Sequence, residues 1–230
     1  MKRFDWVLFD ADHTLFDFDR ASKAALEWAL TSEGFPIEEG YFETYFGINK
    51  ACWRAFEDGA IDRLTLRRQR FERFFAEVGI THDDPEGFNV KYLQRLPHHP
   101  YFLDGALELL EALSGAYRLG LVTNGMKEVQ RPRLARSGID RYFEVIVVSG
   151  EIGVAKPDHA YFAYAHDRMG APDKERVLVI GDNLNSDVRG AQQFGYRGCW
   201  FNPQGVANGE PVTPHYQIRT LAEVHGVLGH

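Results

Sequence analysis

Short apolar runs alternate with amphipathic stretches along most of the 230 residues, and this alternation predicts an α/β fold. The predicted core is a Rossmann-like, doubly wound parallel sheet, and a helical domain is inserted into it. Two observations support this fold: several apolar runs end abruptly in polar residues, as buried parallel strands do, and one long stretch near the N-terminus contains no strong β-run. A chain of this length can bury such a core and also carry a smaller insert.

The expected strands and helices follow one another in regular order. The first strand covers residues 4–9 (FDWVLF) and ends in Asp10-Ala11-Asp12. Further strands are expected at 119–123, 143–148, 177–180 and 198–201. Helices are expected at 106–113, after the strand at 119–123 through about residue 137, at 161–169 and at 186–194. Residues 203–215 are rich in proline and glycine and predict a surface loop.

Residues 20–95 form the predicted insert. Residues 21–30 have a helical pattern, and further along apolar residues recur at helical spacing with arginines between them. We therefore expect one domain to comprise residues 1–16 and 98–230, and the helical domain to comprise residues 17–97.

Composition excludes several classes of protein. Hydrophobic residues make up 44 % and charged residues 26 % of the chain, which is ordinary for a globular protein. The net charge of −7 argues against nucleic acid as a partner, because nucleic-acid backbones are bound by clustered Lys and Arg. Cys52 and Cys199 are far apart, so neither a disulfide framework nor a zinc site is expected. No secretory signal and no long apolar span is found, so we expect a cytoplasmic protein that does not cross a membrane.

Polar residues gather at the ends of the expected strands. Ligands of open parallel sheets bind at the carboxyl ends of the strands, so a site is expected there. The residues at these ends are Asp10 and Asp12, then Thr123, Asn124 and Gly125, then Lys156 in a loop, and finally Asp182 and Asp187.

The charges at this edge predict a cation. Four carboxylates in one cleft repel one another, and burial of an unpaired charge is costly. Lys156 offsets one charge and a divalent cation offsets two more. An all-oxygen site of this kind suits Mg²⁺. The Thr123 hydroxyl and the N–H groups of Asn124 and Gly125 lie where a strand turns toward a helix, a position that favours an anion such as phosphate.

Four segments resemble the signature motifs of the haloacid dehalogenase superfamily. They are residues 10–15 (DADHTL), 122–125 (VTNG), 156–158 (KPD) and 181–187 (GDNLNSD). They occur in the family's order, and the resemblance spans nearly the whole chain. Alone, each segment could be an ordinary turn or helix start. The resemblance implies that residues 17–97 are a helical cap domain that closes over the site.

The resemblance also implies a role for each motif residue. Asp10 would be the nucleophile that forms an aspartyl-phosphate, and Asp12 would be the general acid and then the base. Thr123, Asn124, Gly125 and Lys156 would bind the phosphoryl group. The Mg²⁺ ligands would be Asp10, the backbone carbonyl of Asp12, Asp182 and Asp187, the last directly or through water.

The expected function is hydrolysis of a small phosphate ester. Asp12 disfavours the rival 2-haloacid dehalogenase, because a halide leaving group needs no proton. A sugar-phosphate phosphatase and a phosphomutase remain alternatives on the same fold, and phosphate release without a bisphosphate activator would favour hydrolysis. A non-enzymatic binding module is a further alternative, which the intact set of carboxylates disfavours.

Segments of the insert resemble the branch that hydrolyses pyrimidine nucleoside 5'-monophosphates. These segments are residues 48–50 (INK), Trp53, residues 59–61 (GAI) and residues 70–72 (RFE). Asn49 and Lys50 could contact substrate or cap a helix, and Trp53 could stack on a base or belong to the core. His13 stands where many members have glycine and could contact substrate or only pack, and Phe18 could also stack on a base. The oligomeric state stays open.

Overall fold

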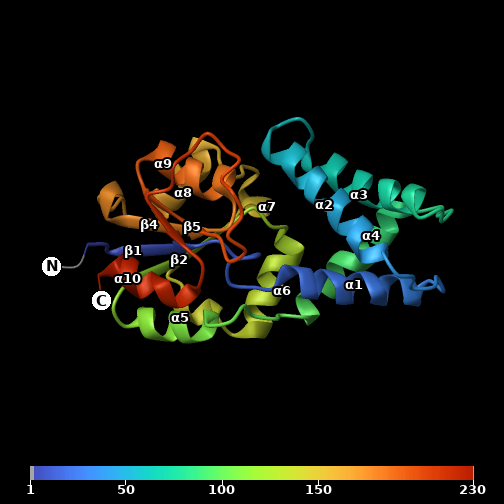
Figure 1. Cartoon of the computed structure of the whole chain (residues 1–230), viewed down its shortest axis with the longest axis horizontal. Helices are drawn as coiled ribbons and strands as arrows, with labels where there is room; N and C mark the ends of the chain where they lie inside the picture. Colours follow the sequence, from blue (N-terminus) through green and yellow to red (C-terminus); the bar gives the residue numbers. More distant parts are fainter. Residues whose placement is uncertain (1–2, 230) are drawn as a thin grey trace. The chain divides into compact units, whose positions relative to one another are not determined.

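The computed structural model describes residues 3–229 and has a parallel sheet flanked by helices, which confirms the predicted α/β fold (Figure 1). The chain divides into two compact units. One is Met1–Phe18 with Tyr101–His230, and the other is Asp19–Pro100. The first is called the core unit below and the second the helical unit.

The sheet of the core unit has six parallel strands in the order β3-β2-β1-β4-β5-β6. The strands are β1 (Trp6–Phe9), β2 (Arg118–Thr123), β3 (Val145–Val148), β4 (Val177–Gly181), β5 (Arg197–Phe201) and β6 (Tyr216–Ile218). β1 is central, and its Leu8 pairs with Gly120 of β2 and Val179 of β4. The edge strand β6 was not predicted, because only three residues form it and it follows a long loop.

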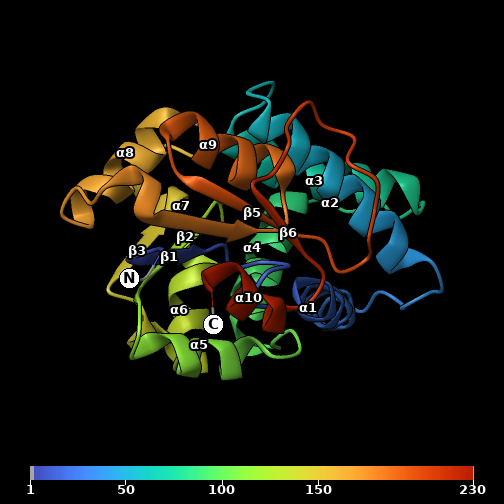
Figure 2. The same ribbon diagram turned by 60° about the vertical axis from the view of Figure 1, so that its left-hand side comes forward.

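Alternate residues of β1 face opposite sides of the sheet, as strand geometry requires. Val7 and Phe9 pack in a cluster with side chains of the helices α5, α6 and α10. Trp6 and Leu8 pack in a second cluster with side chains of α8 and α9. Figure 2 shows these two layers on either side of the sheet. The helices of this unit are α5 (Ala106–Ser114), α6 (Lys127–Ser137), α7 (Ser149–Ile152), α8 (His159–Arg168), α9 (Gly190–Phe194) and α10 (Val224–Leu228).

Four helices build the helical unit: α1 (Phe18–Ser32), whose first residue belongs to the core unit, α2 (Tyr41–Glu57), α3 (Arg63–Glu77) and α4 (Pro85–Arg95). The side chain of Asp62 caps α3 by accepting a hydrogen bond from the Thr65 N–H at 2.7 Å. Pro85 stands at the first position of α4, where its missing N–H costs nothing. The interior is aromatic: Tyr45 stacks on Phe71 with ring centroids 5.0 Å apart.

None of the helices within residues 3–229 combines the length and the apolarity needed to cross a membrane.

Candidate active site

Three carboxylates meet at the carboxyl edge of the sheet. Asp10 follows β1 and Asp182 follows β4, and because these strands are parallel neighbours their ends lie side by side. Asp187 comes from the π-helical turn Leu184–Arg189 that follows β4. One oxygen of each carboxylate lies within 4.8 Å of the others. The sequence predicted that these residues would be neighbours, and the structure brings them together.

Lys156 lies against two of these carboxylates. Its Nζ donates hydrogen bonds to Oδ1 of Asp10 at 2.6 Å, to Oδ1 of Asp187 at 2.5 Å and to the carbonyl oxygen of Val122 at 2.7 Å. The side chain is only 1 % exposed, so the ammonium exchanges its water shell for three oxygen acceptors. A buried ammonium with these partners gives the site a fixed positive charge.

Asn124 fixes the loop that carries Lys156. Its side chain accepts a hydrogen bond from the Lys156 N–H at 2.7 Å and donates one to the Lys156 carbonyl at 2.9 Å. The carbonyl of Asn124 in turn accepts a bond from the Ser149 hydroxyl at 2.8 Å. The Asn124 amide therefore joins the segment after β2 to the segment that presents the lysine.

Burial and mutual repulsion shift the pKa values at this edge. Burial raises the pKa of Asp10 to about 7, although Lys156 lowers it, and Asp187 raises it further. Burial also raises the pKa of Asp182, with Asp187 and Asp10 adding to the shift. Burial alone would lower the pKa of Lys156, but Asp10 and Asp187 outweigh it and the pKa rises. The carboxylates therefore bind protons more readily than usual, and a cation would relieve the same repulsion.

Gly181 makes room for Asp187. A Cβ on Gly181 would lie 2.2 Å from Oδ2 of Asp187, so a larger residue there would displace the carboxylate. The same Oδ2 accepts a hydrogen bond from the Asn183 N–H at 3.1 Å. The Asn183 side chain caps the turn by accepting from the N–H groups of Asn185 and Ser186. Asp187 is thus buried and oriented.

Thr123 ends β2 and is buried, and its Oγ1 accepts a hydrogen bond from the Gly125 N–H at 3.1 Å. The Gly125 N–H, which the sequence assigned to phosphate, is therefore engaged within its own turn. The roles of Thr123 and Gly125 toward a phosphoryl group stay predictions.

The Asp12 carboxylate accepts hydrogen bonds from two side chains that were not predicted from the sequence. Nε2 of Gln130 donates to its Oδ2 at 2.7 Å, and Nη2 of Arg133 donates to its Oδ1 at 2.5 Å. Both donors come from α6 and both are buried. The side chain of Asp12 is 24 % exposed and is not among the three clustered carboxylates. A glutamine and an arginine three residues apart share one helical face, but the sequence does not show that this face is buried.

The residues suggested for substrate specificity lie in two places. His13 has a left-handed backbone (φ 60°), which favours glycine, and its ring lies edge-on to Phe18 with centroids 5.5 Å apart. Asn49, Lys50 and Trp53 lie on α2. Asn49 is buried, and Lys50 is exposed. Trp53 is half-buried and packs edge-on against another aromatic ring of the same helix.

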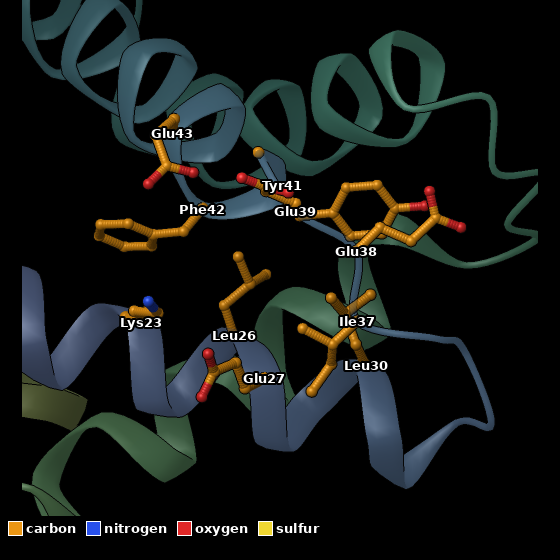
Figure 3. A pocket seen from close by; sticks show the side chains of 11 residues that line it. Lys23, Leu26, Glu27, Leu30, Ile37, Glu38, Glu39, Tyr41, Phe42 and Glu43 are labelled. Carbon is orange, nitrogen blue, oxygen red and sulfur yellow. The ribbon is translucent and has the colours of Figure 1, made fainter.

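A pocket of about 250 Å³ lies within the helical unit, between α1 and the start of α2 (Figure 3). Leu26, Leu30, Ile37 and Phe42 are among its apolar lining residues, and four glutamates and Lys23 also line it. The residues suggested for substrate specificity are not among those that line it. It holds neither the clustered aspartates nor the lysine described above.

The clustered aspartates fit a hard divalent cation. They supply oxygen donors only, they crowd one another, and such a set suits Mg²⁺ better than a soft metal. The ammonium of Lys156 compensates only part of the charge of Asp10, Asp182 and Asp187. The donor set therefore has the chemistry that such an ion requires.

The chain is similar to several known proteins over nearly its full length. Over 229 residues the chain is 34 % identical to the pyrimidine 5'-nucleotidase YjjG of Escherichia coli, with 98 % of each chain covered. It is 33 % identical to the pyrimidine 5'-nucleotidase PynA of Streptococcus pneumoniae, over 96 % of this chain and 93 % of that one. The magnesium-bound crystal structure of YfnB from Bacillus subtilis matches with a TM-score of 0.94 at 34 % identity, covering all of both chains.

A family match decides the assignment. Residues 4–195 match the family described as haloacid dehalogenase-like hydrolase, a range that contains all four motif segments, the whole helical unit and most of the core unit. The chain therefore belongs to the haloacid dehalogenase-like hydrolase family.

Proposed function

We propose that this hydrolase is a magnesium-dependent phosphatase that acts on small organic monophosphates, with pyrimidine nucleoside 5'-monophosphates as its substrates. The observation that carries the reaction class is the carboxylate cluster of Asp10, Asp182 and Asp187 with Lys156 bound against it. The substrate class rests on the relatives, two of which are pyrimidine 5'-nucleotidases.

Asp10, Asp182, Asp187 and the backbone carbonyl of Asp12 would hold Mg²⁺. The bound ion supplies positive charge that allows an anionic nucleophile to approach an anionic phosphate. Lys156 adds a second positive charge, already in place before substrate arrives. Together they remove the repulsion that otherwise keeps a carboxylate away from a phosphate dianion.

In the first half of the reaction a carboxylate oxygen of Asp10 attacks phosphorus. The bond from phosphorus to the ester oxygen breaks, and Asp12 gives its proton to that oxygen, so an alcohol leaves. Lys156 and Thr123 hold the phosphoryl oxygens during the transfer. The product is an aspartyl-phosphate at Asp10 and an ionised Asp12.

In the second half water attacks the phosphorus of the aspartyl-phosphate. The ionised Asp12 takes a proton from the water, the bond from phosphorus to Asp10 breaks, and inorganic phosphate leaves. Both carboxyl groups return to their starting states. Asp12 is also what separates this proposal from a 2-haloacid dehalogenase, whose leaving halide needs no proton.

Phosphate release in chelator and in Mg²⁺ tests the reaction class. Purified protein treated with EDTA should release no phosphate from uridine 5'-monophosphate, and added Mg²⁺ should restore release. Full activity in excess chelator would refute the role given to the ion. Halide release from a 2-haloacid, with no phosphate release from any ester, would favour the dehalogenase.

A panel of monophosphates tests the substrate class. Pyrimidine nucleoside 5'-monophosphates should give higher kcat/KM than sugar phosphates at the same Mg²⁺ concentration. The opposite order would replace the nucleotide with a sugar phosphate and leave the reaction class intact. Stimulation by a bisphosphate without net phosphate release would point to a phosphomutase.

A further inference from the structure

The contact of α6 with Asp12 forms a closed triangle of hydrogen bonds. Arg133 Nη2 donates to Oδ1 of Asp12 at 2.5 Å, and Gln130 Nε2 donates to Oδ2 at 2.7 Å. Nη2 of Arg133 also donates to Oε1 of Gln130 at 2.8 Å. Because both carboxylate oxygens are held by different donors, the carboxyl plane of Asp12 cannot turn without breaking a contact.

The triangle uses only part of the hydrogen-bonding capacity of the Asp12 carboxylate. An ionised carboxylate has about four acceptor positions, and the two donors occupy two of them. The donors are fully buried while the Asp12 side chain keeps 24 % of its exposure. The carboxyl group is therefore anchored by two buried donors and stays partly exposed.

Arg133 is not explained by the stability of the fold alone. Its side chain is 0 % exposed, and its guanidinium lies over the ring of Phe16 at 4.2 Å. Its Nε and Nη1 are buried and have no hydrogen-bond partner within residues 3–229. Buried donors without acceptors destabilise the folded state. An arginine kept at such a cost for a contact with one carboxylate points to a use for that contact.

Gly125 leaves space for the Gln130 side chain of the triangle. A Cβ on Gly125 would lie 2.1 Å from Nε2 of Gln130, so the glutamine side chain occupies the space beside Gly125 on its way to Asp12. The triangle thus joins the first motif segment to the segment after β2.

We infer that Gln130 and Arg133 are positioning residues that orient the Asp12 carboxyl group for the proton transfers of the proposed reaction. This inference rests on the proposed function. It assigns neither residue a contact with substrate: Arg133 acts through Asp12, and Gln130 acts on Asp12 and supports Arg133.

The test uses two esters that differ in their need for a proton. The alcohol that leaves uridine 5'-monophosphate must be protonated as it departs, whereas p-nitrophenolate leaves as a stable anion. Since kcat/KM reports the steps up to the first irreversible one, the ratio of kcat/KM for the two esters measures proton donation. The fraction of folded enzyme cancels in this ratio, so a partly unfolded variant still gives an answer.

Arg133→Met and Gln130→Met should lower kcat/KM for uridine 5'-monophosphate by about 10- to 100-fold, because a misplaced acid loses much of its effect. For p-nitrophenyl phosphate the loss should stay below about threefold. Arg133→Lys keeps the charge and should restore part of the ratio. The matched control is Arg131→Met, which removes an exposed arginine of the same helix that pairs with Glu151 at 2.7 Å; its ratio should equal that of the unmodified enzyme.

The outcomes separate the two proposals. Equal losses on both esters in the Gln130 and Arg133 variants would overturn the positioning role while the phosphatase stands. Unchanged kcat/KM for both esters would do the same. If the unmodified enzyme in Mg²⁺ released phosphate from neither ester, the proposed function would fail, and the positioning role with it.

Discussion

The core unit and the helical unit each bury a cationic side chain, and the partners of these two side chains differ. In the core unit Lys156 faces the carboxylates of Asp10 and Asp187, with Asp182 close by. In the helical unit Arg70 of α3 is 2 % exposed and donates to the side-chain oxygens of Asn49 and Asn89.

The partners of Arg70 are uncharged, unlike those of Lys156. The guanidinium of Arg70 also lies over the rings of Phe71 and Tyr92, at 5.4 and 5.2 Å from their centroids. Neutral amides and rings complete its surroundings, and the contacts join α2, α3 and α4. The core site instead gathers more negative charge than its lysine compensates. Clustered carboxylates in excess of their lysine indicate a site for a cation, whereas hydrogen bonds that join three helices indicate a structural role.

The largest effect should come from Asp10→Asn in the core unit. Loss of the proposed nucleophile should lower the rate of phosphate release by at least about 10³-fold. The fold should be kept, because the change removes one of several repelling charges. Rates and circular dichroism of the purified variant test this. The control is Asp5→Asn, which removes the carboxylate of a surface ion pair with Arg176 and should keep full activity. If Asp10→Asn turned over substrate nearly as fast as Asp5→Asn, the covalent mechanism would be refuted.

Arg70→Met should act on stability rather than on chemistry. The two asparagine oxygens would lose their donor, so the free energy of unfolding should fall by about 2–4 kcal/mol. Urea unfolding measures this change. Arg68→Met removes an exposed arginine of α3 that pairs with Glu72 at 3.5 Å, and it should change stability by less than about 0.5 kcal/mol. A large fall in kcat/KM for Arg70→Met without loss of stability would contradict the contrast between the units.

Magnesium should stabilise the protein through the core unit. At a concentration of about 100 times its dissociation constant, an ion that binds only the folded state adds about 2.7 kcal/mol. Thermal unfolding with and without Mg²⁺ measures the gain. Asp182→Asn should lose most of it, whereas Glu39→Gln in the acidic pocket of the helical unit should keep it. Equal gains in the two variants would show that the ion does not bind at the clustered aspartates.

The smallest effect concerns Glu33 of the helical unit. Burial raises its pKa, but hydrogen bonds from Lys91 and His82 at 2.7 and 2.6 Å outweigh burial, so the pKa lies below its ordinary value of 4.5. A carboxyl group with a lowered folded-state pKa stabilises the fold above its ordinary pKa and loses this contribution as the pH falls through the lowered value.

Glu33→Gln should therefore lower stability near about pH 6 by less than about 1 kcal/mol and have almost no effect near about pH 3. Urea unfolding at the two pH values tests the sign. Glu86→Gln, an exposed change in the first turn of α4, serves as the control. A larger loss at the lower pH would mean that the pKa is raised instead.

The core was predictable because its signals are local. A buried parallel strand is a continuous apolar run, and its end is marked by the residue that must face the site, as at Phe9 and Asp10. Since parallel strands end at a common edge, the grouping of Asp10, Asp182 and Asp187 followed from the order of strands and helices.

The contacts of Asp12 were not predictable in this way. Gln130 and Arg133 stand 118 and 121 residues away from it in sequence. The α6 sequence (KEVQRPRLARS) carries charged or polar residues on all sides, so no pattern marks which of them are buried. Asn49 could not be assigned for a related reason: its partner Arg70 lies on another helix, 21 residues away. Long-range pairing of polar groups leaves no periodic trace in a single sequence.

The space beside Gly125 has a consequence for how this family can diverge. The glycine has no room for a methyl group because a glutamine amide from α6 already fills that volume. A shorter residue at position 130 would vacate it and remove the three closest contacts that alanine at 125 would meet. Positions 125 and 130 should accordingly co-vary among relatives. A chimera of two relatives should lose stability when residue 125 comes from one parent and a mismatched residue 130 comes from the other.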